Sequence, residues 1–376
     1  MKFIIDDKIP YVKGALEPFG DVIYLPGAKI TRDIVKNADA LLIRTRTICN
    51  ESLLSGSSVK FIATATIGYD HIDTAYCRNA GINWTNAPGC NSGSVEQYLA
   101  SALVTYAETK NLDLKNLCIG VVGVGNVGSK VARLCRLLGM KVLLNDPPRA
   151  RTEDPSAFVS LENIMAEADI ISLHVPLNLH GEDATYHLAD TGFFSGLKQR
   201  PLLINTCRGE VVNTSAVKTA LAQGQVSGYI CDCWEQEPDI DLELLSMAWL
   251  ATPHIAGYSR DGKAKGTQMS IQSLSRYFSL RLDQWQPAGI EQPGNPVFEL
   301  NGKGKNEQQL ITEAVVATYN IRSDDSALRR DSTKFELLRG DYPVRREFAA
   351  FTIVPVNIAP SIIKLLKNMG FDIAEP

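Results

Sequence analysis

The chain begins with short apolar runs that alternate with polar, helix-compatible stretches. Each run has the length and the β-branched or aromatic residues typical of a strand. Repeated alternation of strand and helix signals predicts a parallel sheet covered by helices. Five such runs come in order: KFIIDD (2–7), DVIYLP (21–26), ADALLIRT (38–45), VKFIATAT (59–66) and GINWTN (81–86).

A second alternating region follows a turn-rich patch, NAPGCNSGS (86–94), and a helical stretch, VEQYLASALVTYAETK (95–110). Ser92 or Ser94 is expected to cap that helix, because a side-chain oxygen there can accept a free backbone N–H. The next strand-like runs are CIGVV (118–122), KVLLND (141–146), ADIISLHVPL (168–177), PLLINTC (201–207), VSGYICDCW (226–234) and AWLATPHIAG (248–257). They predict a second parallel sheet with its own helices.

The alternation fades after Tyr258. A helical stretch, TQMSIQSLSRYFSL (267–280), precedes a linker rich in Pro and Gly, QPAGIEQPGNP (286–296). The remaining residues carry strand and helix signals of their own, including FAAFTIVPVNIAPSIIKLLKNMGFDI (348–373). The fold class is therefore α/β, with two doubly wound Rossmann-like parallel-sheet domains and a small α+β C-terminal domain.

Composition narrows the functional classes. The net charge is −4 and the pI is about 5.8, whereas a nucleic-acid-binding protein is usually basic. No apolar run is long enough to cross a bilayer, and the first residues turn acidic at once, so we expect a cytoplasmic protein. The eight cysteines are scattered, and the CDC triplet at 231–233 lacks the usual zinc-ligand spacing. We expect reduced thiols and no metal site.

A dinucleotide-binding signature lies at the start of the second region. Gly123, Gly125 and Gly128 form GVGNVG directly after an apolar strand and before a helical run. Such glycines permit a tight turn and let backbone amides approach a pyrophosphate at a helix N-terminus. Asp146 ends the next strand, 18 positions after Gly128, where a carboxylate binds ribose hydroxyls and repels a 2′-phosphate. We therefore expect NAD rather than NADP, although the nearby Arg149 and Arg151 could soften that preference.

Three chemically active residues each follow a strand-like run of the same region. Arg208 is a permanently charged residue in TCRGEVVN, and it needs either a protein carboxylate or an incoming anion as its partner. Because ligands bind outside the carboxyl ends of the strands, Arg208, Glu237 and His254 are expected to meet at one cleft. His254 would act as the base in oxidation of a 2-hydroxy acid, oriented by Glu237, while Arg208 binds the carboxylate. A simple Arg208–Glu237 salt bridge is the structural alternative, and His174 is expected to be structural.

The ordered motifs GVVGVGNVGSKVARL, ISLHVPL, LLINTCRGEVVN, CDCWEQEP and TPHIAG resemble the D-isomer-specific 2-hydroxyacid dehydrogenases over about the first 270 residues. The resemblance implies catalytic roles for Arg208, Glu237 and His254. It also implies a split substrate-binding domain at 1–92 and 258–285, an NAD-binding domain at 93–257 and a C-terminal domain at 286–376. The implied NAD contacts are Gly123, Gly125, Asn126, Val127, Gly128, Asp146, Val175, Cys207, Asp232 and Gly257. Cys207 departs from the small Ala or Ser common before the family's Arg.

A second set of motifs resembles the branch of the family that acts on 4-phospho-D-erythronate in pyridoxal 5′-phosphate synthesis. These motifs are DDKIPY, LLIRTRT, ATATIGYDHID, APGCNSGSV, HIAGYS and the long loop PLNLHGEDATYHLAD. The resemblance implies oxidation to 2-oxo-3-hydroxy-4-phosphobutanoate, substrate contacts at Thr45, Thr66 and Tyr258, and a homodimer formed through the C-terminal domain. Arg44 and Arg46 are further candidates for the phosphate, and side-chain alternation along the strand leads us to prefer Arg44.

Two alternatives stay open. One is a 3-phosphoglycerate dehydrogenase whose C-terminal domain is regulatory, although the long NLHGED loop and the GYS that follows His254 argue against it. The other is an NAD-sensing, corepressor-like binding protein, since a fold does not fix a function. Turnover of a hydroxy acid, rather than NAD binding alone, would distinguish an enzyme from such a sensor.

Overall fold

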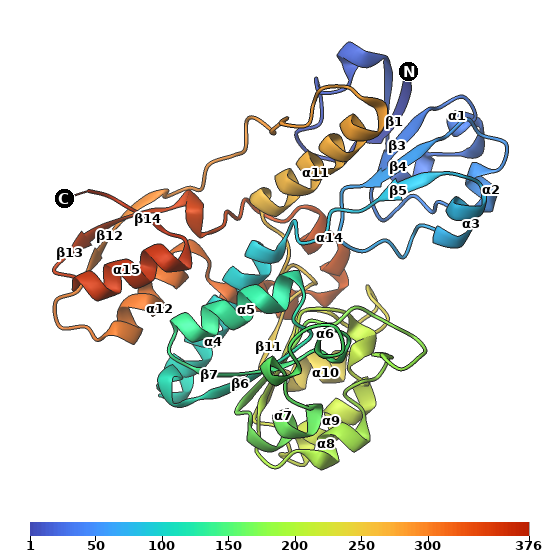
Figure 1. Cartoon of the computed structure of the whole chain (residues 1–376). Helices are drawn as coiled ribbons and strands as arrows, with labels where there is room; N and C mark the ends of the chain where they lie inside the picture. Colours follow the sequence, from blue (N-terminus) through green and yellow to red (C-terminus); the bar gives the residue numbers. More distant parts are fainter. Residues whose placement is uncertain (376) are drawn as a thin grey trace. The chain divides into compact units, whose positions relative to one another are not determined.

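The computed structural model describes residues 1–375. Contacts divide the chain into two compact units. The first unit comprises residues 1–91 and 259–291, and the second comprises residues 92–258 and the described residues from 292 onward. The two sheet-and-helix regions expected from the sequence are present, and so is a small C-terminal sheet (Figure 1). The predicted fold class is therefore confirmed.

The first unit is built on a five-stranded parallel sheet in the order β2-β1-β3-β4-β5. Its strands are β1 (Lys2–Asp6), β2 (Asp21–Leu25), β3 (Ala40–Ile43), β4 (Phe61–Thr64) and β5 (Asn83–Thr85). Its helices are α1 (Arg32–Val35), α2 (Glu51–Leu54), α3 (Thr74–Asn79) and α11 (Arg260–Phe278). The strand order reverses between β1 and β3, and such a switch point is where open α/β sheets bind ligands.

Alternate side chains of the first sheet point to opposite faces. Phe3 and Ile5 of β1 pack in one buried cluster with Ile271 and Leu274 of α11, whereas Ile4 packs in the cluster on the other face. This alternation follows from the two-residue period of a strand. Helix α11 therefore belongs to the first unit although it follows the second sheet in sequence (Figure 1).

The larger sheet of the second unit has six parallel strands in the order β11-β10-β9-β8-β6-β7. They are β6 (Cys118–Val122), β7 (Lys141–Asn145), β8 (Ile170–Leu173), β9 (Leu202–Asn205), β10 (Gly228–Cys231) and β11 (Leu250–Ala251). The helices of this part are α4 (Ser92–Lys110), α5 (Asn126–Leu137), α6 (Pro147–Ala150), α7 (Leu161–Glu167), α8 (Thr191–Gly196), α9 (Thr214–Ala222) and α10 (Leu242–Met247). The order reverses between β6 and β8, which places the glycine-rich turn at the switch point.

The C-terminal segment adds a three-stranded parallel sheet in the order β12-β13-β14. Its strands are β12 (Val297–Asn301), β13 (Thr352–Val356) and β14 (Asp372–Ile373). Its helices are α12 (Glu307–Thr318), α13 (Ile321–Arg330), α14 (Phe335–Gly340) and α15 (Pro360–Met369). The expected strand followed by a helix is confirmed as β13 and α15, and residues 286–296 form the expected irregular linker.

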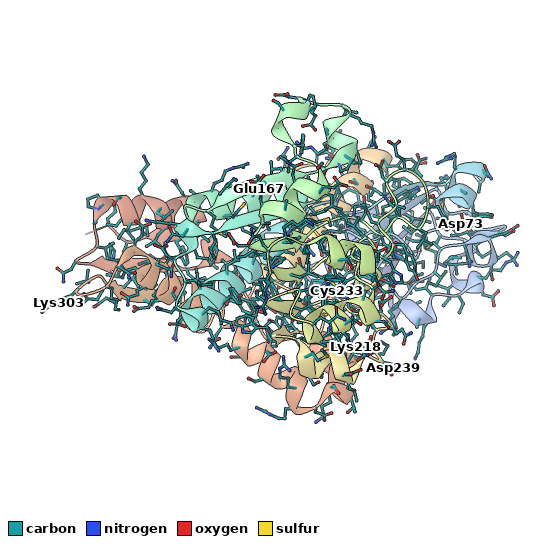
Figure 2. The ribbon with its side chains drawn as sticks, turned by 90° about the horizontal axis from the view of Figure 1, so that it is seen from below. Asp73, Glu167, Lys218, Cys233, Asp239 and Lys303 are labelled. Carbon is teal, nitrogen blue, oxygen red and sulfur yellow. The ribbon has the colours of Figure 1, made fainter. Side chains whose placement is uncertain are left out.

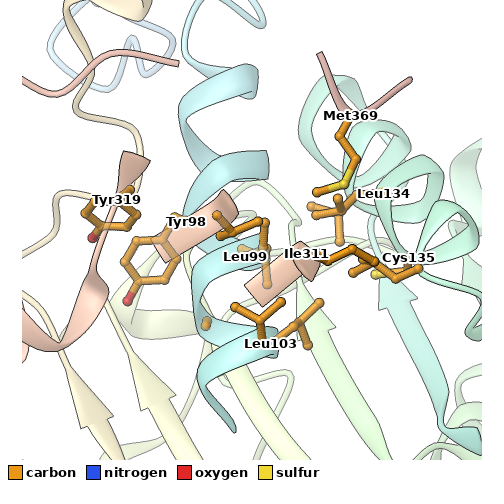
Figure 3. Packing of buried hydrophobic residues seen from close by; sticks show 14 of the residues in the cluster. Tyr98, Leu99, Leu103, Leu134, Cys135, Ile311, Tyr319 and Met369 are labelled. Atoms are coloured by element: carbon orange, nitrogen blue, oxygen red, sulfur yellow. The ribbon is translucent and has the colours of Figure 1, made fainter. Parts of the chain in front are cut away.

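The core of the second unit is continuous between the larger sheet and the C-terminal segment. Leu99 of α4 and Leu134 of α5 lie in the same buried cluster as Ile311 of α12 and Met369 of α15 (Figure 3). These buried side chains explain why the C-terminal segment falls in the same compact unit as the six-stranded sheet.

The predicted cap of the long helix α4 is wrong. The helix begins at Ser92, so Ser92 and Ser94 lie within its first turn rather than before it. The Oγ of Ser94 instead donates to Oε1 of Glu347 at 2.9 Å. A local capping rule cannot anticipate this tertiary partner, which lies 253 residues away along the chain.

No helix within residues 1–375 is both long enough and apolar enough to cross a membrane. All eight cysteines are buried and none forms a disulfide within that range.

Candidate active site

The glycine-rich turn joins β6 to α5, and its three glycines differ in what a side chain at each position would contact. Gly123 has a φ of +85°, and a Cβ there would lie 2.7 Å from the backbone of His174. A Cβ on Gly128 would lie 1.9 Å from the carbonyl oxygen of Gly123. A Cβ on Gly125 would meet nothing within 4 Å. The first and last glycines thus allow close packing, whereas the space beside Gly125 and the start of α5 suits the approach of a pyrophosphate.

Asp146 follows β7 and is fastened to that turn. Its Oδ2 accepts a hydrogen bond from the Val124 N–H at 2.8 Å, and its Oδ1 accepts from the Arg149 N–H at 3.1 Å. The carboxylate is thereby held beside the glycine-rich turn, where a ribose would lie. The two arginines that could soften NAD preference are already paired, Arg149 with Glu153 and Arg151 with Glu182 and Asp183.

The other residues implied as cofactor contacts lie at the ends of neighbouring elements. Asn126 and Val127 open α5, Val175 follows β8, Cys207 follows β9 and Gly257 lies in the loop between β11 and α11. Burial raises the pKa of the Cys207 thiol to about 11, so the side chain is a neutral group. Its N–H donates to Oδ1 of Asn205 at 3.1 Å. Cys207 therefore contributes shape rather than charge.

Asp232 is fully buried and organises the loop that carries His254. Its Oδ1 accepts hydrogen bonds from Thr252 Oγ1 at 2.6 Å and from the Ile255 N–H at 2.8 Å. Its Oδ2 accepts from the Ala256 N–H at 2.9 Å. Burial raises the pKa of Asp232 despite these bonds. Sequence reasoning expected a cofactor contact here, and the geometry adds a structural role that fixes the loop.

Glu237 and His254 form a hydrogen-bonded pair. The Nδ1 of His254 lies 2.8 Å from Oε2 of Glu237 and 3.0 Å from Oε1. Although burial opposes ionisation, the bonds to His254 and to the Trp234 N–H hold the pKa of Glu237 below its usual value. His254 has a φ of +54°, a left-handed conformation that is strained for a side chain other than Gly. An ionised carboxylate thus fixes the imidazole so that Nε2 is the nitrogen left for chemistry.

Arg208 lies on the turn after β9. Its Nη1 donates to its neighbour, the Cys207 carbonyl, at 2.8 Å, and Nδ2 of Asn205 donates to the Arg208 carbonyl at 2.8 Å. The ion pairs of Glu237 within residues 1–375 are with His254 and Arg339. The alternative of an Arg208–Glu237 salt bridge is therefore not what the structure contains.

A third potential metal-ligand atom lies beside this pair. Cys233, labelled in Figure 2, is buried, and its ligand atom falls within 4.8 Å of those of Glu237 and His254. Burial raises the pKa of the Cys233 thiol well above its ordinary value. The hydrogen bond between Glu237 and His254 already accounts for the closeness of two of these three atoms.

Two other histidines have their own partners. His174 lies 2.9 Å from Ser172 through Nε2, and burial lowers its pKa to about 3, which keeps it neutral. His187 pairs with Glu235 at 2.8 Å. The second pair resembles the Glu237–His254 pair in exposure, at 25% and 20% against 26% and 18%.

The C-terminal segment supplies two arginines to this region that the sequence did not reveal. Nη1 of Arg339 lies 3.9 Å from Oε2 of Glu237, and its guanidinium lies 5.6 Å from the centre of the Tyr258 ring. Arg345 is buried and donates to the carbonyls of Ile255 and Ala256. Both contacts link residues more than eighty positions apart, so no local pattern could have predicted them.

The remaining substrate candidates belong to the first unit, except Tyr258. Thr45 is exposed after β3, and Nη1 of Arg44 donates to the Lys8 carbonyl at 3.3 Å. Thr66 lies 2.7 Å from Thr64 through its Oγ1, which also donates to the Gly68 carbonyl at 2.9 Å. These residues follow the carboxyl ends of β3 and β4, where the ligands of a parallel sheet bind.

Comparisons with known proteins show the family to which the chain belongs. A family model described as the NAD-binding domain of D-isomer specific 2-hydroxyacid dehydrogenases matches residues 94–256, and a model described as a domain of unknown function matches residues 292–370. An erythronate-4-phosphate dehydrogenase from Bacteroides fragilis is 52% identical over 355 residues, covering 94% of this chain and 99% of that protein. A protein of the same name from Porphyromonas gingivalis is 39% identical, covering 99% of this chain and all 100% of the relative.

Solved structures show the same architecture. D-lactate dehydrogenase from Aquifex aeolicus, complexed with NAD and lactic acid, has a TM-score of 0.62 at 27% identity and covers 76% of this chain and 97% of that one. An NAD-dependent formate dehydrogenase from Staphylococcus aureus, in complex with NAD, has a TM-score of 0.61 at 22% identity. It covers 74% of this chain and 96% of that one. The second likeness concerns the fold alone.

Proposed function

Since this chain belongs to the erythronate-4-phosphate dehydrogenases of the D-isomer specific 2-hydroxyacid dehydrogenase family, we propose that it oxidises the C2 hydroxyl of 4-phospho-D-erythronate. The chain is an NAD-dependent 2-hydroxyacid dehydrogenase. The product is 2-oxo-3-hydroxy-4-phosphobutanoate, in line with a role in pyridoxal 5′-phosphate synthesis. The observation that carries the chemistry is the Glu237–His254 pair, with its carboxylate fixed on Nδ1.

His254 acts as the general base. Its Nε2 takes the proton of the C2 hydroxyl while the hydrogen on C2 leaves with its electron pair, so the alcohol becomes a ketone. Bound NAD supplies the hydride acceptor. The ionised Glu237 stabilises the imidazolium that results, and its bond to Nδ1 keeps the ring oriented. In the reverse direction the same imidazolium returns the proton.

Arg208 binds the substrate carboxylate and polarises the forming carbonyl. A guanidinium presents a planar fork of donors that matches a carboxylate, and it is charged at every working pH. Asn205 fixes the backbone of this turn, which follows β9, by donating to the Arg208 carbonyl. The side chain of Arg208 is oriented separately, through contacts such as its hydrogen bond to the Cys207 carbonyl.

Substrate and cofactor contacts complete the proposal. Thr45, Thr66 and Tyr258 contact the substrate, and Arg44 approaches its phosphate. The glycine-rich turn would hold the pyrophosphate of NAD, and Asp146 would bind the adenosine ribose. The remaining contacts would come from the start of α5, Val175, Cys207, Asp232 and Gly257.

We also propose a homodimer formed through the C-terminal segment. The small sheet exposes Val297 on β12 and Val354 on β13, with exposures of 57% and 36%, and Val354 lies opposite Glu299, two residues along β12 from Val297. Apolar side chains in this position suit a symmetric contact, the commonest form of oligomer. A monomer by light scattering at micromolar concentration would contradict this. All eight cysteines are buried and form no disulfide within residues 1–375, which supports a cytoplasmic location, where thiols stay reduced.

Steady-state turnover tests the function. NADH formation would be followed with 4-phospho-D-erythronate and with 3-phosphoglycerate offered separately, and with a 2-oxo acid added in parallel to reoxidise bound NADH. We expect a clear preference for 4-phospho-D-erythronate. A preference for 3-phosphoglycerate would show that this acid is the substrate instead. NAD binding without turnover of either acid would indicate a sensor.

A further inference from the structure

Three cationic residues gather at the switch point of the first sheet. Arg44 directly follows β3, and its Nη1 bonds the Lys8 carbonyl just beyond β1. Arg260 and Lys263 lie three positions apart at the start of α11 and therefore share one face of that helix. The sequence singled out only the first of the three.

The packing of α11 places its first turns over the carboxyl ends of the central strands. Oγ1 of Thr267 donates to the carbonyl of Pro10, which follows β1, at 2.9 Å. A Cβ on Gly266 would lie 2.8 Å from the carbonyl oxygen of Ala65, which follows β4. Strand β3 lies between β1 and β4 in the sheet, so Lys263, one turn earlier on α11, is held near Arg44.

Like charges that gather in this way repel one another. Lys263 is half-buried, and its pKa falls to about 8 through burial and through the nearby charges of Arg44 and Arg260, while Glu291 acts in the opposite sense. Nε of Arg260 lies 3.7 Å from Oε1 of Glu291, and that Nε is buried with no hydrogen-bond partner within residues 1–375. Cations that are held together at such a cost are typical of a binding site.

We propose that Lys263, together with Arg44 and Arg260, binds the phosphate of the substrate. The proposal rests on the function given above, because it assigns the anion to the phosphate of 4-phospho-D-erythronate. A phosphate dianion offers several acceptor oxygens, and it would neutralise the repulsion among the three cations.

A comparison of phosphorylated and unphosphorylated substrates tests the assignment. KM and kcat would be measured for Lys263→Met with 4-phospho-D-erythronate and with D-erythronate. We expect KM for the phosphorylated acid to rise roughly tenfold or more, since bonds to charged groups are strong, with a smaller change in kcat. The ratio of kcat/KM between the two acids should fall accordingly. Lys265→Met is the matched control, because Lys265 is exposed on the same helix.

Two further measurements keep the outcome clear. Inorganic phosphate should inhibit the wild type in competition with the substrate, and this inhibition should weaken in Lys263→Met and recover in Lys263→Arg. If the wild type oxidises 4-phospho-D-erythronate but Lys263→Met keeps its KM and its phosphate inhibition, the phosphate assignment is wrong. If the wild type does not oxidise that acid at all, the proposed function fails instead.

Discussion

Nδ1 of His254 lies 2.8 Å from Oε2 of Glu237, and the same carboxylate accepts the Trp234 N–H through Oε1 at 2.9 Å. The second bond anchors the carboxylate to the backbone, so the imidazole is oriented by the protein frame rather than by a mobile side chain. Asp232 fixes the other side of the arrangement by bonding the backbone after His254. The base is thus held from two directions before any substrate arrives.

Removing the charge of Glu237 should slow the chemical step. Glu237→Gln keeps the shape of the side chain but no longer stabilises an imidazolium. We expect kcat to fall about 10²-fold or more, with little change in NAD affinity. Glu235→Gln is a matched control, because Glu235 forms a similar pair with His187 at 2.8 Å. Equal losses in the two variants would show that the effect is structural rather than catalytic.

Asp146 should control the choice between NAD and NADP. Asp146→Ser removes the carboxylate that repels a 2′-phosphate and keeps a polar atom near the Val124 N–H. The ratio of kcat/KM for NAD over NADP should fall by about tenfold or more, since one charge contact is worth about 1.4 kcal/mol or more. Arg149 and Arg151 are held by acidic partners, so we do not expect a full reversal. An unchanged ratio would show that Asp146 serves only the turn.

The gathering of Lys263, Arg44 and Arg260 should lower the free energy of unfolding near neutral pH. Because burial and the charges of Arg44 and Arg260 lower the pKa of Lys263 from 10.5 to about 8, its charged form disfavours the native state. The unfolded chain keeps this proton up to a higher pH than the native state does. The free energy of unfolding therefore increases as the pH rises from about 8 to about 10.5. Lys263→Met should therefore raise Tm near pH 7, and the gain should shrink near pH 10. Scanning calorimetry would show this, and a lower Tm near pH 7 would contradict it.

Arg345 should be needed for the stability of the second unit. Its buried guanidinium donates to Gln97 Oε1 at 2.9 Å and to the Ile255 carbonyl at 3.2 Å, and it lies 3.8 Å from the centre of the Tyr319 ring. Arg345→Met leaves these acceptors without a donor, which should lower the free energy of unfolding by about 3 kcal/mol or more. Urea denaturation measures this, with the exposed Arg330→Met as control. A loss no larger than that of the control would refute the role.

The fold and the chemistry were predictable where local pattern governs them. The alternation of apolar runs predicted both large sheets, and GVGNVG with Asp146 predicted the cofactor turn, because turn and strand-end residues act over short distances. The residues Arg208, Glu237 and His254 follow the strand ends at which the sequence placed them.

Partners that are distant along the chain could not be predicted. Arg339 reaches Glu237 from α14, and Ser94 pairs with Glu347 rather than capping α4. Lys263 was not predicted, because the whole second sheet separates α11 from the first sheet in sequence. In the folded chain α11 packs on the first sheet. A single sequence shows the periodic pattern of apolar positions, from which helices and strands can be predicted. These contacts depend instead on which elements pack against one another in the folded chain.

The most direct test of the account is the turnover of 4-phospho-D-erythronate by the wild type and by His254→Gln, read as NADH formation with NAD binding measured in parallel. We predict turnover by the wild type, a loss of about 10²-fold or more in the variant and unchanged NAD binding. Turnover that survives in His254→Gln, at any pH, would contradict the assignment of His254 as the base.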